Sequence, residues 1–253
     1  MSTAGIRINQ PFLNDSLTVG GSLAEALVGD SHLINWYQAD ARSLTLEGAE
    51  IVSFNDKKPT GSKYTRNSGS NSATLVNALF GIYPGAKFNP AESDKSVFSG
   101  STPNLAVPFS WAGVATLAGN AASGTLFGTF TSSTVRSILR VGVGTTALQF
   151  QYGTTQTAAL PVTLGLPFAF AAGFDGTNLF LKVNGAESIV PVAGAPGSST
   201  MALGGLTSGG QFWDGNVSDI FVCDLALNAA DAANQALLRK IRNFTQTVYG
   251  VST

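Results

Sequence analysis

The feature of the sequence that most constrains the fold is a pair of tight turns set between apolar runs. Phe168–Ala172 and Leu179–Val183 are strand-like, Asp175-Gly176 stands between them, and Asn184-Gly185 follows the second run. Asp-Gly and Asn-Gly favour two-residue hairpin loops, because a type I′ turn needs a positive φ at both central positions. Two such hairpins in succession predict a meander of antiparallel strands.

Further strands are expected on both sides of this meander. Leu148, Phe150 and Tyr152 alternate with glutamines, as the residues of a half-buried strand do. Apolar or small residues occupy every second position of 109–117, which places Trp111 in the core. The other expected strands are 33–37, 51–54, 138–143, 201–205 and 217–223. Because turn residues recur at short intervals through 100–225, the pattern favours a sandwich or barrel of antiparallel strands.

The two ends of the chain differ from this strand-rich middle. Residues 1–30 are expected to form an extended docking arm with a short helical turn near 22–28, and 31–253 to form one domain. The assembly contacts of the arm are assigned to its apolar residues, Ile6, Ile8, Phe12, Leu13 and Leu17. Asn228 is the expected N-cap of one C-terminal amphipathic helix. Apolar residues recur along that helix at helical spacing, at Leu237, Leu238, Ile241, Phe244 and Val248.

Charge is scarce and balanced. Only 11% of the residues are charged, against about 25% in a typical domain, and 14 basic residues face 15 acidic ones. This balance provides no long-range attraction to nucleic acid or to an anionic membrane. No apolar run approaches the ~18 residues of a membrane span, and no secretory signal is visible. We therefore expect a protein made in a cytosol, with neither nucleic acid nor membrane as its partner.

A family resemblance rests on five segments, 36–41, 52–56, 174–185, 203–220 and 225–227. They resemble the strands, hairpins and helix start of concanavalin A-like and laminin-G-like jelly-roll domains, most strongly over 168–228. The resemblance implies an all-β, antiparallel jelly-roll sandwich that covers about 32–250. Sandwiches of this kind serve as lectins, glycanases, receptor modules and virion components, so the fold alone assigns no activity.

The residue types argue against catalysis. A glycanase of this fold needs a closely spaced pair of carboxylates across the scissile bond, and none of the five glutamates forms such a pattern. His32 is the single histidine, and no Gly-x-Ser-x-Gly nucleophile motif accompanies it. Cys223 ends a strand-like run and is expected to be a buried apolar residue. We expect a protein that is not an enzyme.

Two kinds of binding site remain open. No cofactor is expected, but relatives in the resembling superfamily bind calcium, and Asp175, Asn178 and Asp219 are the residues kept for that alternative. For a sugar, Trp213, Asp214 and Tyr152 are the expected contacts, and Trp213 is expected to be partly exposed because it lies in a glycine-rich turn. Tyr83 and Tyr64 are further aromatic candidates, although burial in the core is the commoner fate of such residues.

The loop 57–66 carries several basic residues and has two interpretations. It binds an anionic partner, or it is an ordinary solvated loop, since loops normally carry such charges.

Two functions follow from these expectations. The first is a structural virion protein of a bacteriophage, a capsid decoration or tail component that is held by its arm and assembles with virion proteins and with copies of itself, as a trimer. The sparse charge supports it, because such a surface suits a protein packed against neighbours. The alternative is a carbohydrate-binding, lectin-like module for a surface glycan. In the first case the protein resides in the virion, after assembly in a host cytoplasm.

Overall fold

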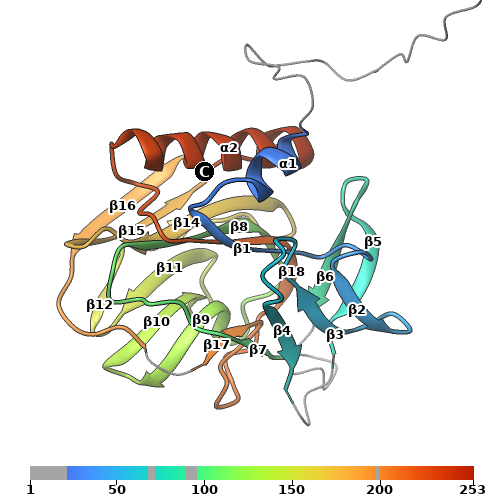
Figure 1. The fold of residues 1–253 in the computed structure, drawn as a ribbon. Coiled ribbons are helices and arrows are strands. Elements are labelled where there is room, and N and C mark those ends of the chain that lie inside the picture. Colours follow the sequence, from blue (N-terminus) through green and yellow to red (C-terminus); the bar gives the residue numbers. More distant parts are fainter. Residues whose placement is uncertain (1–21, 68–71, 89–95, 198–199) are drawn as a thin grey trace, which may run out of the picture.

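A computed structural model describes residues 22–67, 72–88, 96–197 and 200–253 of the chain (Figure 1). It confirms the predicted fold class, because antiparallel strands form a sandwich that ends in one long helix. The elements in chain order are α1 (Leu23–Val28), β1 (Leu33–Gln38), β2 (Leu44–Glu47), β3 (Glu50–Asn55), β4 (Lys63–Arg66), β5 (Thr74–Phe80), β6 (Tyr83–Phe88), β7 (Phe98–Gly100), β8 (Phe109–Leu117), β9 (Gly124–Ser132), β10 (Val135–Val141), β11 (Ala147–Tyr152), β12 (Thr155–Gln156), β13 (Leu160–Pro161), β14 (Pro167–Phe174), β15 (Asn178–Val183), β16 (Ala186–Pro191), β17 (Met201–Leu203), β18 (Gly215–Cys223) and α2 (Ala232–Tyr249).

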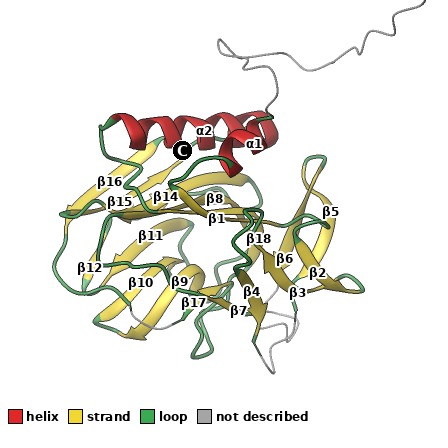
Figure 2. Cartoon of the chain, viewed as in Figure 1, coloured by secondary structure: helices red, strands yellow, loops and turns green. Residues whose placement is uncertain are grey.

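The strands form two layers beneath the helices. The layer next to the helices, the proximal sheet, has the order β16-β15-β14-β8-β18-β1, and β6 also pairs with β18. The second layer, the distal sheet, has the order β11-β10-β9-β17-β7-β4-β3-β2. β5 pairs with both β6 and β3 and so joins the two layers at one edge. Figure 2 shows both helices on the same side of the sandwich.

The main core lies between the two sheets. It contains Trp111 from β8 and Leu148, Phe150 and Tyr152 from β11, which confirms the alternation expected for both strands. Because successive residues of a strand point to opposite faces, Gln149 and Gln151 lie on the other side of β11. The strands of the distal sheet therefore have one face in the core and one face directed away from the helices.

A second apolar cluster lies between the proximal sheet and the helices. The face of α2 that carries Leu237, Leu238, Ile241 and Phe244 is buried there, which confirms the expected amphipathic pattern. Phe244 packs edge-on against Trp36 of β1, with ring centroids 5.0 Å apart. Ala112 of β8 and Ala171 of β14 are the small sheet residues in this cluster, and their side chains let the helices approach closely. The central strands are consequently buried on both faces.

The turn chemistry was predicted in part. Asn184 and Gly185 both have a positive φ, +47° and +87°, and join β15 to β16 as the expected two-residue loop. In the preceding hairpin the turn is shifted by one residue, because Asp175 pairs with Asn178 through a backbone bond of 3.0 Å. Gly176, with φ +100°, is then the first central residue, which is the glycine position of a type II′ turn.

The helix termini also differ from expectation. Asp231, not Asn228, is the N-cap of α2, and its side chain accepts a hydrogen bond from the Asn234 backbone. Asn228 instead donates to Asp175. The helical turn expected near 22–28 is present as α1, whose N-cap Ser22 forms a reciprocal capping box with Glu25.

The five apolar arm residues assigned to assembly, Ile6, Ile8, Phe12, Leu13 and Leu17, lie outside the described residues.

Candidate functional site

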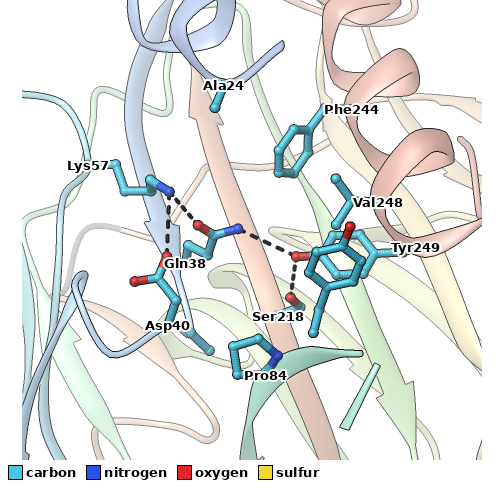
Figure 3. A pocket seen from close by; sticks show the side chains of 11 residues that line it. Ala24, Gln38, Asp40, Lys57, Pro84, Ser218, Phe244, Val248 and Tyr249 are labelled. Atoms are coloured by element: carbon cyan, nitrogen blue, oxygen red, sulfur yellow. Dashed lines mark hydrogen bonds and ion pairs between the residues drawn. The ribbon is translucent and has the colours of Figure 1, made fainter. Parts of the chain in front are cut away.

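A pocket of about 230 Å³ lies where the C-terminal end of α2 meets the end of β1 (Figure 3). Its floor is formed by strands β1 and β18, and its sides by α2, α1, the start of β6 and the loops after β1 and β3. The residues that line it are Ala24, Gln38, Ala39, Asp40, Lys57, Tyr83, Pro84, Ser218, Phe244, Val248 and Tyr249. The pocket thus combines polar side chains with aromatic and aliphatic surface.

The floor is shaped by a β-bulge in β18. The pairing with β8 shifts between Val217 and Asp219, so Ser218 is an extra residue. A bulge of this kind re-aims a side chain, and two consecutive residues, Ser218 and Asp219, here face the helices. Asp219 pairs with Gln38 of β1, and Gln38 shares a face with Trp36 because the two are separated by two positions. The bulge therefore brings a hydroxyl and a carboxyl group into an otherwise apolar layer.

The last turn of α2 provides the apolar wall. Phe244 and Val248 are four residues apart and lie above the pocket in Figure 3, on the same side of the helix. Tyr249 is the last helical residue, and Gly250 ends the helix with φ +72°. The Tyr249 ring packs edge-on against Tyr83 of β6, with centroids 5.6 Å apart. Both tyrosines are half-buried, so each ring keeps some surface exposed at the pocket.

A chain of polar contacts crosses the pocket (Figure 3). The Lys57 ammonium donates to the Gln38 side-chain oxygen and lies 3.5 Å from the Asp40 carboxylate. The Gln38 amide donates to the Tyr249 hydroxyl at 3.5 Å, and that hydroxyl lies 2.6 Å from Ser218 Oγ. A cation, a carboxylate, an amide and two hydroxyls are thus arranged in one row beside the tyrosine rings.

Asp219 lies beneath this row and has no exposed surface. Its carboxylate accepts hydrogen bonds from Trp36 Nε1 at 2.6 Å and from the Tyr249 hydroxyl. Burial raises the pKa of Asp219 to about 6, although the hydrogen bonds from Tyr249 and Trp36 act in the opposite direction. Burial and the Asp219 charge also raise the pKa of Tyr249. Near neutral pH the floor therefore holds a carboxylate while Tyr249 keeps its proton.

The expectation that Trp213 is partly exposed is wrong. Its side chain is 1% exposed, since the indole packs over the backbone of Gly124 and Gly215. Glycines that were interpreted as a sign of an open turn instead make room for the ring. Tyr152 is 3% exposed and donates its hydroxyl proton to the Leu105 carbonyl, and Asp214 is half-buried beside Gly119. These three residues do not form a shared surface site.

The other aromatic candidates differ from each other. Tyr64 is 1% exposed and belongs to the main core, where it packs against Tyr37 with ring centroids 4.7 Å apart. Tyr83 lines the pocket beside Tyr249. Of the aromatic residues singled out from the sequence for sugar contact, Tyr83 alone lies in the pocket.

The structure separates the residues kept for calcium. Asp175 and Asn178 share the β14–β15 turn, where the Asp175 carboxylate accepts backbone hydrogen bonds from Thr177 and Asn178 and thereby stabilises the turn. Asp219 pairs with Val114 of β8, whereas Phe174, next to Asp175, lies beside Phe109 of that strand. The two positions on β8, Phe109 and Val114, are five residues apart, which corresponds to roughly 16 Å along the strand. Asp219 is therefore too far from the β14–β15 turn to share a calcium ion with Asp175 and Asn178. In the described ranges no three His, Cys, Asp or Glu side chains are grouped as metal ligands would be.

The single histidine and cysteine are placed away from the pocket. The imidazole of His32 forms an exposed hydrogen bond of 3.0 Å with the Asp224 carboxylate. Cys223 is buried, as expected, and burial raises the pKa of its thiol.

The basic segment 57–66 is more structured than a solvated loop. Lys57 enters the pocket, and Lys58 donates to the backbone carbonyls of Asp30 and Leu33. The segment ends in β4, where Arg66 pairs with Glu50 at 2.9 Å.

Sequence reasoning missed most of the polar residues of the pocket. Gln38, Ser218 and Tyr249 come from three elements that are distant in sequence. Gln38 and Ser218 lie in segments that were used for the fold resemblance, but neither was singled out as a site residue. One signal was available, because Val217-Ser218-Asp219 places two polar residues in succession within an apolar strand. Such a pair breaks the period-2 pattern and indicates a bulge.

Comparison with known proteins identifies the fold but no family. No family model matches the chain, and no curated protein matches it. Among solved structures, domain 4 of a GH43 extracellular arabinanase from Geobacillus stearothermophilus, in complex with arabinotriose, superposes with a TM-score of 0.56 at 15% identity. The alignment covers 81% of this chain and 98% of that domain.

Two further similar structures are larger proteins. A structure of botulinum neurotoxin type C, reported with the dependence of its cell entry on two ganglioside molecules, has a TM-score of 0.55 at 10% identity over 84% of this chain. Trypanosoma rangeli sialidase in complex with the inhibitor DANA has a TM-score of 0.54 at 12% identity over 83% of it. This chain spans 51% of the neurotoxin chain and 33% of the sialidase. At such identities the likeness establishes a β-sandwich fold and nothing about its ligand.

Neither described helix has the length and apolar character needed to cross a membrane.

Proposed function

We propose that this chain is a carbohydrate-binding module that is not an enzyme, and that the pocket beside Tyr249 holds the sugar. The observation that carries the proposal is the composition of the pocket. A sugar presents hydroxyls at its rim and apolar C–H groups on its faces, so its site needs polar groups next to aromatic surface. The pocket has both within about 230 Å³.

The polar row suits hydroxyl recognition in particular. The Gln38 amide both donates and accepts, Asp40 accepts, and Lys57 donates. Lys57 and Asp40 are 3.5 Å apart and half-buried, so one sugar hydroxyl placed between them donates to the carboxylate and accepts from the ammonium. The half-exposed rings of Tyr83 and Tyr249 provide the apolar contact.

The size of the pocket restricts the ligand. Pockets for drug-sized ligands measure about 300–1,000 Å³, and this one is smaller. We therefore expect one or two sugar units to enter, with the rest of a glycan outside. The similarity to a domain whose structure is in complex with arabinotriose supports a sugar as the ligand and makes arabinotriose the first probe.

We also propose that the protein has no enzymatic activity on glycans. Among the lining residues Asp40 is the single carboxylate. Asp219 lies beneath the floor of the pocket, and its oxygens accept hydrogen bonds from Trp36 and Tyr249. Glycoside hydrolysis needs two carboxyl groups on either side of the scissile bond. The test is the release of reducing sugar from arabinan and from sialylated oligosaccharides, and turnover of either would overturn this part of the proposal.

The experiment for binding is calorimetric titration with a panel that starts from arabinotriose and includes sialylated and neutral oligosaccharides. Two variants, Gln38→Leu and Tyr83→Ala, remove one polar and one aromatic contact. Each is expected to weaken binding roughly tenfold, the loss of about one hydrogen bond or ring contact. Gln235→Leu is the matched control, because Gln235 lies near the other end of α2 and donates to the Ala229 carbonyl.

Thermal melting shows whether each variant still folds. Binding of no member of the panel would contradict the proposal. So would a sugar that binds Gln38→Leu, Tyr83→Ala and the natural chain equally well.

A structural role in a virion is the second candidate. Exposed apolar side chains favour it, because Val143 and Leu166 are 66% and 57% exposed at loops that follow β10 and β13. A backbone hydrogen bond from Val162 to Thr146 holds these two loops side by side. Light scattering of the full chain and of 22–253 tests this role. An oligomer that dissociates without 1–21 would support it, whereas two monomers would oppose self-assembly.

A further inference from the structure

Two arginines lie on the face of the distal sheet that is directed away from the helices. Arg136 and Arg140 are four residues apart on β10, so they share one face, and Leu139 and Val141 on the other face belong to the main core. At ~3.3 Å per residue their α-carbons are roughly 13 Å apart. This surface lies across the sandwich from the pocket, and its argument does not depend on the proposed function.

Neither arginine has an acidic partner among the described residues. Arg136 Nε donates to the Gly153 carbonyl at 3.1 Å, and one Nη of Arg140 donates to Ser123 Oγ at 2.9 Å. The ion pairs of the described residues all involve other side chains. Both arginines are half-buried, and a charge that is partly withdrawn from water is normally compensated by an opposite charge.

The pKa shifts agree with this geometry. Burial lowers the pKa of Arg136. Burial also lowers the pKa of Arg140, and the nearby charge of Arg136 lowers it further. Both guanidinium groups nevertheless stay charged, because an arginine does not lose its proton under ordinary conditions. The pair therefore forms a positively charged surface. Binding of an external anion would lower the electrostatic free energy of the two guanidinium groups.

The strands around the pair contain no acidic residue. β9, β11 and β12 contribute Gly, Thr, Ser, Ala, Leu, Phe, Tyr and Gln alone. Gln149 lies directly opposite Arg140 on the same face, and its amide donates to the Thr157 carbonyl at 3.0 Å. The half-buried ring of Phe130 lies opposite Arg136. Gln151, opposite Ile138, is buried and lies beneath the surface. The surface thus combines two cations with one accessible amide and one aromatic ring.

We propose that this surface, formed by Arg136, Arg140 and Gln149, binds an acidic polysaccharide through its carboxylate or sulfate groups. Arginine pairs with both groups through two parallel hydrogen bonds, which gives geometric specificity as well as attraction. The Gln149 amide suits the hydroxyls of the same sugars. A nucleic acid fits less well, because its binding depends on neutralising many phosphates and the chain has a net charge of −1.

The test is binding of the full chain to immobilised heparin as the sulfated probe and to polygalacturonate as the carboxylated probe, with uncharged dextran for comparison. We expect each of Arg136→Gln and Arg140→Gln to weaken binding to the preferred polyanion about tenfold, the value of one charge-assisted contact. Arg239→Gln is the matched control, because Arg239 is exposed on α2, on the opposite side of the molecule.

Two further comparisons separate specific recognition from plain charge attraction. Arg136→Lys and Arg140→Lys keep the charge but lose the paired hydrogen bonds, so we expect them to weaken binding severalfold. Duplex DNA at the same ionic strength should bind more weakly than the preferred polysaccharide. Equal binding by the natural chain and the Arg→Gln variants, or no binding of either polyanion at low salt, would overturn the proposal. Duplex DNA bound as tightly as the polysaccharides would also overturn it.

Discussion

The two sheets of the sandwich differ in what covers their outer faces. The proximal sheet has the main core on one face and the helices on the other, and every residue of β8 is buried. The distal sheet has no helix layer over its outer face, and polar and apolar residues alternate along β11. The difference shows where each sheet can carry function. A covered sheet forms a pocket where its cover ends, whereas an uncovered sheet presents a surface.

The largest expected effect concerns the helix-covered face. Phe221 of β18 has no exposed surface and packs against Trp36 and Phe244, with centroids 5.3 and 6.0 Å away. Phe221→Ala should lower the free energy of unfolding by about 3–5 kcal/mol, the usual cost of a large cavity. Phe130→Ala on the distal sheet should cost less, because that ring is half-exposed.

Urea denaturation of both variants measures this difference. If Phe221→Ala cost under about 1 kcal/mol, the helix layer would be a loose addition and not part of the core.

The second effect is a pH dependence that originates at Asp219. Its pKa is raised from 3.8 to about 6 by burial, so the folded protein binds a proton more tightly than the unfolded chain does. The contribution of Asp219 to stability is therefore complete below about pH 4 and is lost as the pH rises through 6, by about 3 kcal/mol in total.

Denaturation between pH 4 and 8 checks the Asp219 effect. Asp219→Asn should remove this part of the pH dependence, whereas Asp231→Asn, which changes an exposed carboxylate, should keep it. Identical pH profiles for the natural chain and Asp219→Asn would show that the carboxyl group is not held as described.

A third, smaller effect tests how the helix cover begins. Asp231 caps α2, so Asp231→Ala should destabilise the protein by about 1 kcal/mol. Asn is as good an N-cap as Asp, so Asp231→Asn should cost only a few tenths of a kcal/mol. Thermal melts of the two variants make the comparison. Equal losses would mean that the charge, and not the capping hydrogen bond, matters at this position.

The smallest effect is expected in the loop that follows β10 of the distal sheet. Val143 is 66% exposed, and Val143→Ser should change the free energy of unfolding by less than about 0.5 kcal/mol. Chemical denaturation of a dilute sample measures it. A loss above 1 kcal/mol would indicate that this residue is covered in solution, as it would be in an oligomer.

The sequence predicted more strands of the proximal sheet than of the distal one. The expected strands include β1, β8, β14, β15 and β18, whereas β2, β4, β7 and β9 of the distal sheet were missed. Period-2 alternation is clearest where polar residues alternate with core residues, as in β11, and it placed Phe150 and Tyr152 correctly. In β14 both faces are buried, so Ala169 and Ala171 beneath the C-terminal segment and α2 carry no periodic signal. The apolar face of α2 was predicted, but not the sheet against which it packs.

The pocket was harder to predict than the fold. It arises from a bulge at Ser218, from the last residue of a helix and from loops that meet only in three dimensions. Trp213 shows the opposite error, because a local glycine-rich context was used to infer exposure, whereas tertiary packing decides it. Tyr83 was named as a candidate for sugar contact and Lys57 as part of a basic loop, and only the fold placed them together.

The most direct measurement is a crystal structure of the chain soaked in the oligosaccharide that binds most tightly in the titration panel. Binding of sugar in the pocket predicts electron density for one or two sugar units between Gln38, Tyr83 and Tyr249, with a hydroxyl within hydrogen-bond distance of Lys57 and Asp40. Density for a neutral sugar elsewhere, with the pocket unchanged, would contradict the assignment of this site.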